Sequence, residues 1–225
     1  MDLYTRIDLL IMAVPLALSF DRRVAFWRKW PQVWVAIAVV MAVFIPWDIW
    51  KTVRGVWGFN PEYAGEWRCL HLPLGEWLFF ICVPYACLFI LECVRGYIPD
   101  RVLGLSRRGV LVVAAGLAAA AWLLRHRIYS GTVVLSAGGL LAAMEWAVPA
   151  TLRSRHFWVA LVLSYLPFLA ANGLLTALPI VWYDPARILG IRVGSIPWED
   201  FFYSFSMLLL AILVHDSAGR WRRAA

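Results

Sequence analysis

Residues 195–204 read SIPWEDFFYS, and residues 71–80, which lie 124 positions earlier, read HLPLGEWLFF. In both stretches a proline is followed by acidic and then aromatic residues, so that Pro73 aligns with Pro197 and Glu76 with Asp200. The same offset holds without a gap over roughly 70 residues, which identifies an internal repeat. It also aligns polar residues and loop prolines that shared hydrophobicity does not explain, namely Asp48 with Asn172, Thr52 with Thr176, and Asn60-Pro61 with Asp184-Pro185.

The composition is that of a membrane protein. Of the 225 residues, 63% are hydrophobic and 16% are charged, whereas about a quarter of an ordinary soluble domain is charged. The apolar residues form blocks of about 18–22 residues, long enough to cross roughly 30 Å of hydrocarbon. We predict an all-α polytopic membrane protein with seven transmembrane helices, at about 3–20, 33–53, 75–95, 109–127, 131–150, 156–177 and 198–217. No small-residue cleavage site follows the first apolar run, so we expect it to be a retained helix.

The repeat unit contains three of these helices. We expect a first three-helix repeat over residues 1–97, a linker with the spacer helix over 98–129, and a second three-helix repeat with a basic C-terminal tail over 130–225. Because three is odd, two units joined directly would cross the membrane in opposite directions. The spacer helix restores the direction, so we predict parallel repeats whose acidic motifs lie on one side and face one shared cavity.

The formal net charge is +7. The basic residues are scattered over short loops without a recognition motif, so we exclude a nucleic-acid partner and assign them to membrane topology. Thirteen of the 21 Lys and Arg residues lie on the side of the C-terminus, and eight, Lys51 among them, lie on the side of the acidic motifs. This bias predicts a cytoplasmic C-terminus. The acids on that side, Asp21, Glu92, Glu145 and Asp216, are expected to form interface salt bridges.

Ionisable side chains in or near hydrocarbon cost a few kcal/mol each and therefore call for an explanation. On the side of the motifs these are Asp48, Glu76, Glu199 and Asp200, joined by Asn172 as the repeat counterpart of Asp48. The helix dipole favours one carboxylate at each helix start, but it explains neither a second one beside it nor Asp48 near a helix end. Two adjacent carboxylates in a low dielectric keep one proton near neutral pH. We predict a proton donor here and place the proton on Glu199, which aligns with Gly75.

Aromatic residues crowd both motifs. Some of them belong to the aromatic belt at the membrane interface. Aromatic faces beside a proton donor also suit carbocation chemistry, in which a proton adds to an alkene and ring quadrupoles hold the cation. The aromatic candidates for substrate contact are Trp47, Trp77, Trp198, Phe201, Phe202 and Tyr203, the last of which could also tune the proton relay.

Several motifs that would indicate other chemistry are missing from the sequence. There is no GxGxxG for a dinucleotide, no HExxH, no GxSxG and no Walker sequence. The four cysteines lack CxxC spacing, so neither a metal nor a disulfide is implied. No DxxxD pair is present for diphosphate and Mg²⁺, which argues against a prenyltransferase. We expect no cofactor and no metal.

The chain resembles the membrane-embedded lycopene cyclase domain family, in the fused two-repeat form of the heterodimeric bacterial and archaeal carotenoid cyclases. The resemblance rests on the tandem three-helix repeat and on Pro197-Trp198-Glu199-Asp200-Phe201-Phe202-Tyr203 with its degenerate copy Pro73–Phe79. Trp47-Asp48, Asn60-Pro61 and Asp184-Pro185 also look like the family. The first repeat departs from the motif at Gly75, so the two copies are chemically unequal.

The resemblance implies a lycopene β-cyclase of the intramolecular lyase or isomerase type. Such an enzyme converts the linear ψ-ends of lycopene to β-ionone rings without redox chemistry and without a flavin. It implies that Glu199 and Asp200 form the principal acid, with Glu76 and Asp48 in supporting or base roles, and that Asn172, Asn60 and Asp184 join the aromatic residues at the substrate. The implied partners are a long polyene, the lipid bilayer of a prokaryotic cytoplasmic membrane and other carotenoid-biosynthesis enzymes.

Three other functions stay open at this point. A carotenoid hydratase would use the same acid but let water capture the cation. A small-solute or proton transporter would fit parallel repeats with acids in the membrane, although the aromatic crowding fits it less well. A scaffold or partner subunit would leave the paired acids without a chemical role.

Overall fold

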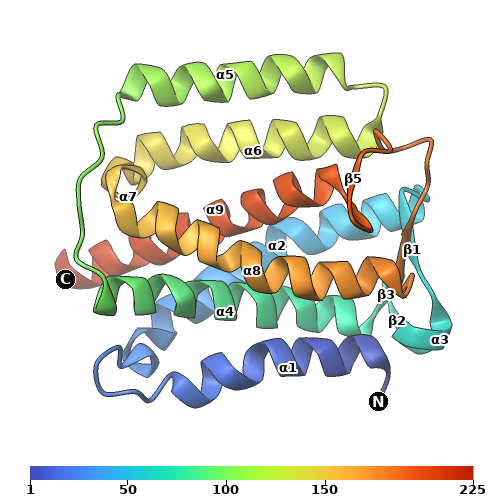
Figure 1. Cartoon of the computed structure of the whole chain (residues 1–225), viewed down its shortest axis with the longest axis horizontal. Coiled ribbons are helices and arrows are strands. Elements are labelled where there is room, and N and C mark those ends of the chain that lie inside the picture. Colours follow the sequence, from blue (N-terminus) through green and yellow to red (C-terminus); the bar gives the residue numbers. More distant parts are fainter. Residues whose placement is uncertain (225) are drawn as a thin grey trace.

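The computed structural model describes residues 1–224, with side chains up to Arg220, so Arg222 and Arg223 of the basic tail lie outside the described side chains. Seven long helices of the described chain run along one axis (Figure 1): α1 (Leu3–Leu18), α2 (Trp30–Val53), α4 (Leu74–Tyr97), α5 (Arg107–Leu123), α6 (Ile128–Ala147), α8 (Arg155–Ala177) and α9 (Trp198–Ala224). Short helices connect them: η1 (Phe26–Lys29), α3 (Pro61–Ala64) and α7 (Pro149–Arg153). The short strands, which the sequence did not predict, are β1 (Trp57–Phe59), β2 (Arg68–Cys69), β3 (Leu72–Pro73), β4 (Val181–Tyr183), β5 (Arg192–Val193) and β6 (Ile196–Pro197).

Five helical segments are long and apolar enough to cross a membrane: Phe26–Val53, Leu74–Tyr97, Ile128–Ala147, Arg155–Ala177 and Trp198–Arg220. The helices α1 and α5 have 16 and 17 residues, which is short of the roughly 20 residues that span a typical bilayer. The protein is therefore mostly helical and has the apolar helices of a membrane protein, as predicted. Five of the seven predicted spans reach full spanning length.

The internal repeat is confirmed in three dimensions. Moving by 124 residues carries α2 onto α8, α4 onto α9, β1 onto β4 and the β2–β3 hairpin onto the β5–β6 hairpin. The first helices of the two units, α1 and α6, run in the same direction (Figure 1). The two units are thus parallel, and α5 is the spacer between them.

The strands β1 and β4 join the two repeats. They pair antiparallel, with Gly58 opposite Trp182 at the centre of the ladder. These two residues are repeat counterparts, so the ladder lies across a pseudo-two-fold axis. Gly58 is needed there because a Cβ atom at this position would lie 2.4 Å from the Trp182 ring.

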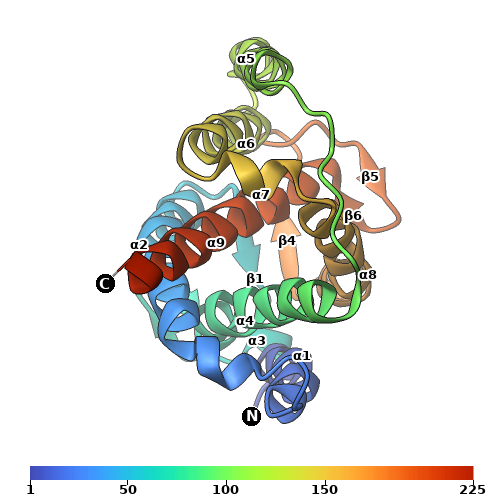
Figure 2. The ribbon, with the colours of Figure 1, turned by 90° about the vertical axis from the view of Figure 1, so that its left-hand side faces the viewer.

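The helices α2, α4, α8 and α9 surround the centre of the molecule, and β1 and β4 lie across one end of it (Figure 2). The helix α6 packs outside this ring against α9, and α5 is outermost and packs against α6. Small residues allow that last contact, since a Cβ atom on Gly138 would lie 2.9 Å from the Ala114 carbonyl oxygen.

Ion pairs cluster at the end of the bundle opposite the hairpins. Glu92 pairs with Lys29 and Arg95, Arg95 also binds Asp216 at 2.7 Å, and Glu145 binds Arg153 at 2.8 Å. The predicted salt bridges thus form for these three acids. Asp21 instead accepts hydrogen bonds from the backbone N–H groups of Val24 and Arg23, and the bond from Val24 contributes most to lowering its pKa.

Lys51 corrects the sequence-based topology count. We counted it among the loop charges on the side of the acidic motifs, but it lies inside α2 and is fully buried. A lysine enclosed by protein reports nothing about loop charge, because the topology rule concerns basic residues that face the membrane surface.

Candidate active site

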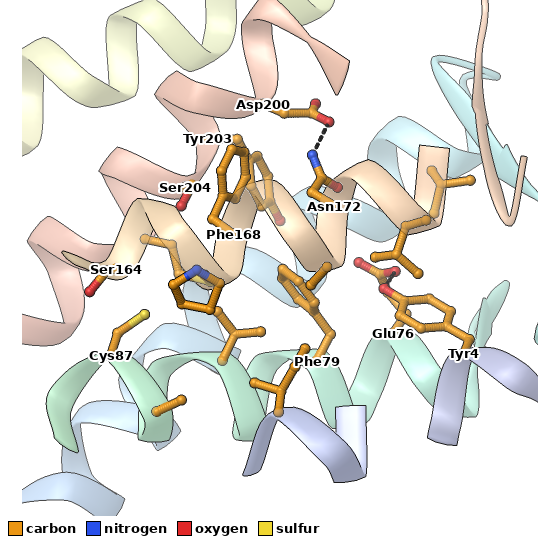
Figure 3. A pocket seen from close by; sticks show the side chains of 18 of the residues that line it. Tyr4, Glu76, Phe79, Cys87, Ser164, Phe168, Asn172, Asp200, Tyr203 and Ser204 are labelled. Atoms are coloured by element: carbon orange, nitrogen blue, oxygen red, sulfur yellow. Dashed lines mark hydrogen bonds between the residues drawn. The ribbon is translucent and has the colours of Figure 1, made fainter. Parts of the chain in front are cut away.

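A cavity of about 440 Å³ lies between α1, α4, α8 and α9. Three carboxyl groups reach its wall near the hairpins, those of Asp48, Glu76 and Asp200. Figure 3 shows Glu76 and Asp200 at one part of the cavity and Cys87 and Ser164 farther along it. Most of the remaining wall is apolar. We call the end of the cavity that is lined by Asp48, Glu76 and Asp200 its head.

The hairpins place the two first-turn acids. Each hairpin ends at a proline, Pro73 or Pro197, and the next residue starts a helix, α4 or α9. Glu76 and Asp200 therefore lie in the first turn of their helices at equivalent positions, where the helix dipole favours an acidic group. Both side chains are buried, with 7% and 4% of their surface exposed.

In the first repeat two carboxyl groups face each other. Asp48 in α2 is buried, and its carboxyl lies within hydrogen-bonding contact of that of Glu76. The Tyr4 hydroxyl donates to Glu76 at 2.7 Å, and the Tyr203 hydroxyl donates to Asp48 at 2.8 Å. Two carboxyl groups in contact inside a dry site hold a proton between them, since two ionised ones would repel.

In the second repeat one carboxyl group is surrounded by donors. Asp200 accepts hydrogen bonds from the Tyr129 hydroxyl at 2.6 Å, the Tyr183 hydroxyl at 2.8 Å and the Asn172 amide at 2.8 Å (Figure 3 shows the last). Burial, followed by the nearby Asp200 carboxylate, raises the pKa of Tyr183 well above its ordinary value, so Tyr183 stays a phenol that donates. Three donors satisfy an ionised carboxylate.

The two sites are therefore equivalent in position and different in chemistry. Glu76 corresponds to Asp200, and Asp48 corresponds to Asn172. The first repeat pairs a carboxyl with a carboxyl, whereas the second pairs a carboxyl with an amide. This exchange of Asp for Asn gives the cavity one site with two facing carboxyl groups and one site with a single carboxyl group held by three hydrogen-bond donors.

Glu199 points away from the cavity. Its carboxyl accepts hydrogen bonds from the Ser130 hydroxyl in α6 and from the backbone N–H of Leu189. Asp200 belongs to the lining of the cavity within the described residues, and Glu199 does not. The counterpart Gly75 makes room for Tyr4, because a Cβ atom there would lie 2.4 Å from the Tyr4 ring. Glu199, on which the sequence placed the proton, therefore lies outside the cavity lining, whereas Asp48, Glu76 and Asp200 belong to it.

The predicted substrate contacts divide into two groups. Tyr203 and Asn172 line the cavity. Trp47 lies outside the lining and packs on the lining residue Tyr203, with the two stacked ring centroids 5.5 Å apart. The other aromatic candidates pack outside the lining: the Trp77 indole donates to the Cys69 carbonyl, and Trp198, which is 42% exposed, packs against Phe201 and Phe202.

Asn60 and Asp184 also lie away from the cavity lining. Each accepts a hydrogen bond from the backbone N–H two residues later, Asn60 from Glu62 at 3.0 Å and Asp184 from Ala186 at 2.8 Å. Since these are repeat counterparts, both Asn-Pro and Asp-Pro elements form the same turn. Asp184 also forms an ion pair with Arg187.

Four groups that were not among the predicted site residues lie in the same part of the protein as the acids. Three of them are the hydroxyls of Tyr4, Tyr129 and Tyr183, which donate hydrogen bonds to Glu76 or Asp200. The fourth group is the Lys51 amine, which lies 3.5 Å from the Trp47 ring centroid and 4.4 Å from that of Tyr129 and has no hydrogen-bond partner among the described residues. Tyr4 and Tyr129 do carry a signal, since both lie near the starts of predicted spans on the side of the acids.

The described residues contain no group of three or more His, Cys, Asp and Glu side chains placed to hold a metal ion. The groups at the head of the cavity are instead carboxyls, phenols and one amide. They can donate, hold and accept protons beside an apolar ligand.

The fold and this site define a helical membrane protein with duplicated three-helix units and a carboxyl cluster at the head of an apolar cavity. The family model described as lycopene cyclase matches residues 1–94 and 111–218. The chain therefore belongs to the lycopene cyclase family and is a carotenoid cyclase. No curated protein and no solved structure matched the chain.

Proposed function

We propose that this protein is a lycopene β-cyclase that closes the linear ψ-ends of lycopene into β-ionone rings by protonation, cyclisation and deprotonation. The observation that carries the proposal is the unequal pair of acid sites at the head of one apolar cavity. A redox-neutral cyclisation needs one proton donor and one proton acceptor around the same end group, and the cavity offers one of each.

The Asp48–Glu76 pair is the proton donor in this proposal. Its shared proton adds to the terminal alkene of the polyene and leaves a tertiary carbocation. Tyr4 and Tyr203 hold the two carboxyls in place through their hydroxyls. Positioned general acids of this kind contribute about 10²–10⁴-fold to a rate.

A second alkene of the same chain then attacks the cation, which forms the ring bond and moves the charge onto a ring carbon. Asp200 takes a proton from the neighbouring ring carbon, the new double bond forms, and the product is an isomer of the substrate. The proton now on Asp200 must return to the Asp48–Glu76 pair before the next cycle. These roles reverse those that the family resemblance implied from sequence.

In this proposal the aromatic rings of the cavity wall stabilise the carbocation, and its apolar side chains exclude water. Rings of Trp57, Phe59, Phe79, Tyr129, Tyr183 and Tyr203 line the cavity. A π face positioned over a positive charge stabilises it by about 2 kcal/mol when the site is desolvated. Because the apolar walls exclude water, they favour internal capture of the cation over hydration. This is why we place the cyclase ahead of a hydratase.

We further propose that all seven long helices cross the cytoplasmic membrane of a prokaryote, with the C-terminus in the cytoplasm. The short helices α1 and α5 would cross where the bilayer thins or where flanking side chains reach its surface. The ion pairs at the C-terminal end of the bundle would then face the cytoplasm, and the hairpins and acids would lie toward the outer side.

Expression in bacteria that accumulate lycopene, followed by pigment analysis, tests the proposed function. We expect carotenoids with β-rings and the mass of lycopene. Hydroxylated acyclic pigments would instead identify a hydratase. Unchanged lycopene in membranes that contain the folded protein would contradict the proposal.

A further inference from the structure

The head of the cavity is lined by residues that follow the pseudo-two-fold symmetry of the repeats. The rest of the cavity is lined by residues that do not follow this symmetry. Around the head, six pairs of repeat counterparts line the wall together: Asp48 and Asn172, Trp57 and Val181, Phe59 and Tyr183, Glu76 and Asp200, Phe79 and Tyr203, Val83 and Met207. Beyond the head, the cavity continues between α4 and α8, toward α1 (Figure 3). On the symmetry-equivalent side α2 packs closely along α9, and among the described α2 residues Asp48 alone belongs to the cavity lining.

A single exchange of residues explains much of this difference. Ala171 of α8 lines the open side, and its counterpart in α2 is Trp47. The Trp47 ring stacks on Tyr203 and packs against Phe44, at 5.4 Å between centroids, which fills the equivalent position. One turn further, Leu175 of the open side corresponds to Lys51, whose amine lies over the same Trp47 ring.

The helices themselves follow the same asymmetry. The helix α2 packs closely along both α9 and α4, whereas α8 packs along α4 and hardly along α9. Aromatic side chains stand between α8 and α9: the Phe201 ring stacks against Tyr165 at 5.9 Å and meets Phe168 edge-on at 5.2 Å. These aromatic side chains therefore form the wall of the cavity between α8 and α9.

The open side ends at a lateral mouth between α1 and α8. Leu10 and Val14 of α1 line the cavity although 72% and 60% of their surface is exposed. They lie six and ten residues beyond Tyr4, which is about 9 and 15 Å along the helix. Pro15 of α1 and Pro167 of α8 line the same passage. In a membrane, a mouth at this depth opens sideways into hydrocarbon.

We propose that this passage is a tail channel for the unreacted part of the polyene, and that it forces the enzyme to process one end group for each binding event. The proposal rests on the proposed function. One end of the substrate lies at the acids, and the rest of the chain leaves through the mouth between α1 and α8 into the bilayer. A substrate comparable in length to the roughly 30 Å hydrocarbon layer cannot be enclosed within 15 Å of channel.

The second ring then requires release and reversal. Since the equivalent channel on the α2 side is closed by Trp47, no second end group can enter the head while the first one occupies it. A carotenoid with two rings would arise only after the one-ring product leaves into the membrane, turns and binds again with its other end.

The variant Ala171→Trp tests the channel because it copies onto α8 the residue that closes α2. We expect at least a tenfold loss of conversion and a matching loss of the lycopene that copurifies with the protein. The matched control is Leu169→Trp on the same helix, whose residue is 41% exposed and lies outside the lining set of the described chain. It should change neither readout by more than about twofold. Wild-type conversion and retention by Ala171→Trp would overturn the proposal.

A competition experiment with the unmodified protein tests the same proposal without any risk of misfolding. Labelled lycopene is supplied in proteoliposomes, and a large excess of unlabelled lycopene is added when one-ring product first appears. Release after each ring predicts that labelled product stops at one ring. Continued appearance of labelled two-ring product at its earlier rate would overturn the proposal.

The two hypotheses can fail separately. If the wild-type protein retains lycopene but forms no ring, the proposed function is wrong, while loss of retention in Ala171→Trp still supports the channel. If rings form and Ala171→Trp behaves like the wild type, the channel is wrong and the proposed function stands.

Discussion

The substitution Asp48→Asn removes the shared proton and little else. It gives the first repeat the same carboxyl–amide pair that Asn172 and Asp200 form in the second repeat. The new amide oxygen can still accept the hydrogen bond from Tyr203, which is 2.8 Å long in the native protein. Because only the charge-assisted part of that bond is lost, we expect a change of about 1 kcal/mol in the free energy of unfolding.

The effect on the reaction should be far larger. Loss of a positioned general acid lowers a rate by about 10²–10⁴-fold, which corresponds to roughly 3–5 kcal/mol in activation free energy. The assay is the initial rate of ring formation from lycopene in membranes, normalised to the amount of folded protein. The matched control is Glu145→Gln, which removes another buried carboxyl, but at the opposite end of the bundle where Glu145 binds Arg153. It should retain the wild-type rate within about twofold. A wild-type rate for Asp48→Asn would refute the assignment of the proton to this pair.

Three further substitutions separate the remaining roles. Asp200→Asn should lower ring formation by at least about 10²-fold, because an amide cannot take the ring proton; a rate within tenfold of wild type would contradict the base role. Glu199→Gln should leave the rate within about threefold, while weaker bonds to Ser130 and Leu189 lower stability by roughly 1–2 kcal/mol in a thermal melt; a hundredfold loss of rate would return the chemistry to Glu199. Lys51→Leu should raise the melting temperature, since it replaces a buried amine that has no hydrogen-bond partner among the described residues by an apolar side chain; a lower melting temperature would contradict this.

The fold was largely predictable because its signals are periodic and local. The 124-residue offset aligned the helices and acidic motifs of one repeat with those of the other, whereas the short strands and their hairpins carried no signal of their own. The lengths of α1 and α5 were less predictable, since a polar turn such as that over residues 19–25 ends a helix without interrupting the apolar composition around it. A hydropathy average over a long window includes such a turn with its apolar neighbours and therefore does not show where the helix ends.

The site was predictable in part. Carboxyl groups in hydrocarbon are rare enough to stand out, which identified Asp48, Glu76 and Asp200. Their partners depend on which helices are neighbours, so the contacts of Tyr4 with Glu76 could not be read from one sequence. Adjacent residues on a helix point about 100° apart, so only one member of the Glu199–Asp200 pair could face the cavity. Periodicity alone does not say which one.

The most direct test of the central claim is a single turnover in D₂O. Protein equilibrated in D₂O and held in excess over lycopene should give a ring product that carries one deuterium for each ring formed, because the Asp48–Glu76 pair supplies an exchangeable proton. Apart from that deuterium, the product should have the mass of lycopene. A cyclic product without deuterium would contradict proton-initiated cyclisation, and a product heavier by one molecule of D₂O would contradict the cyclase itself.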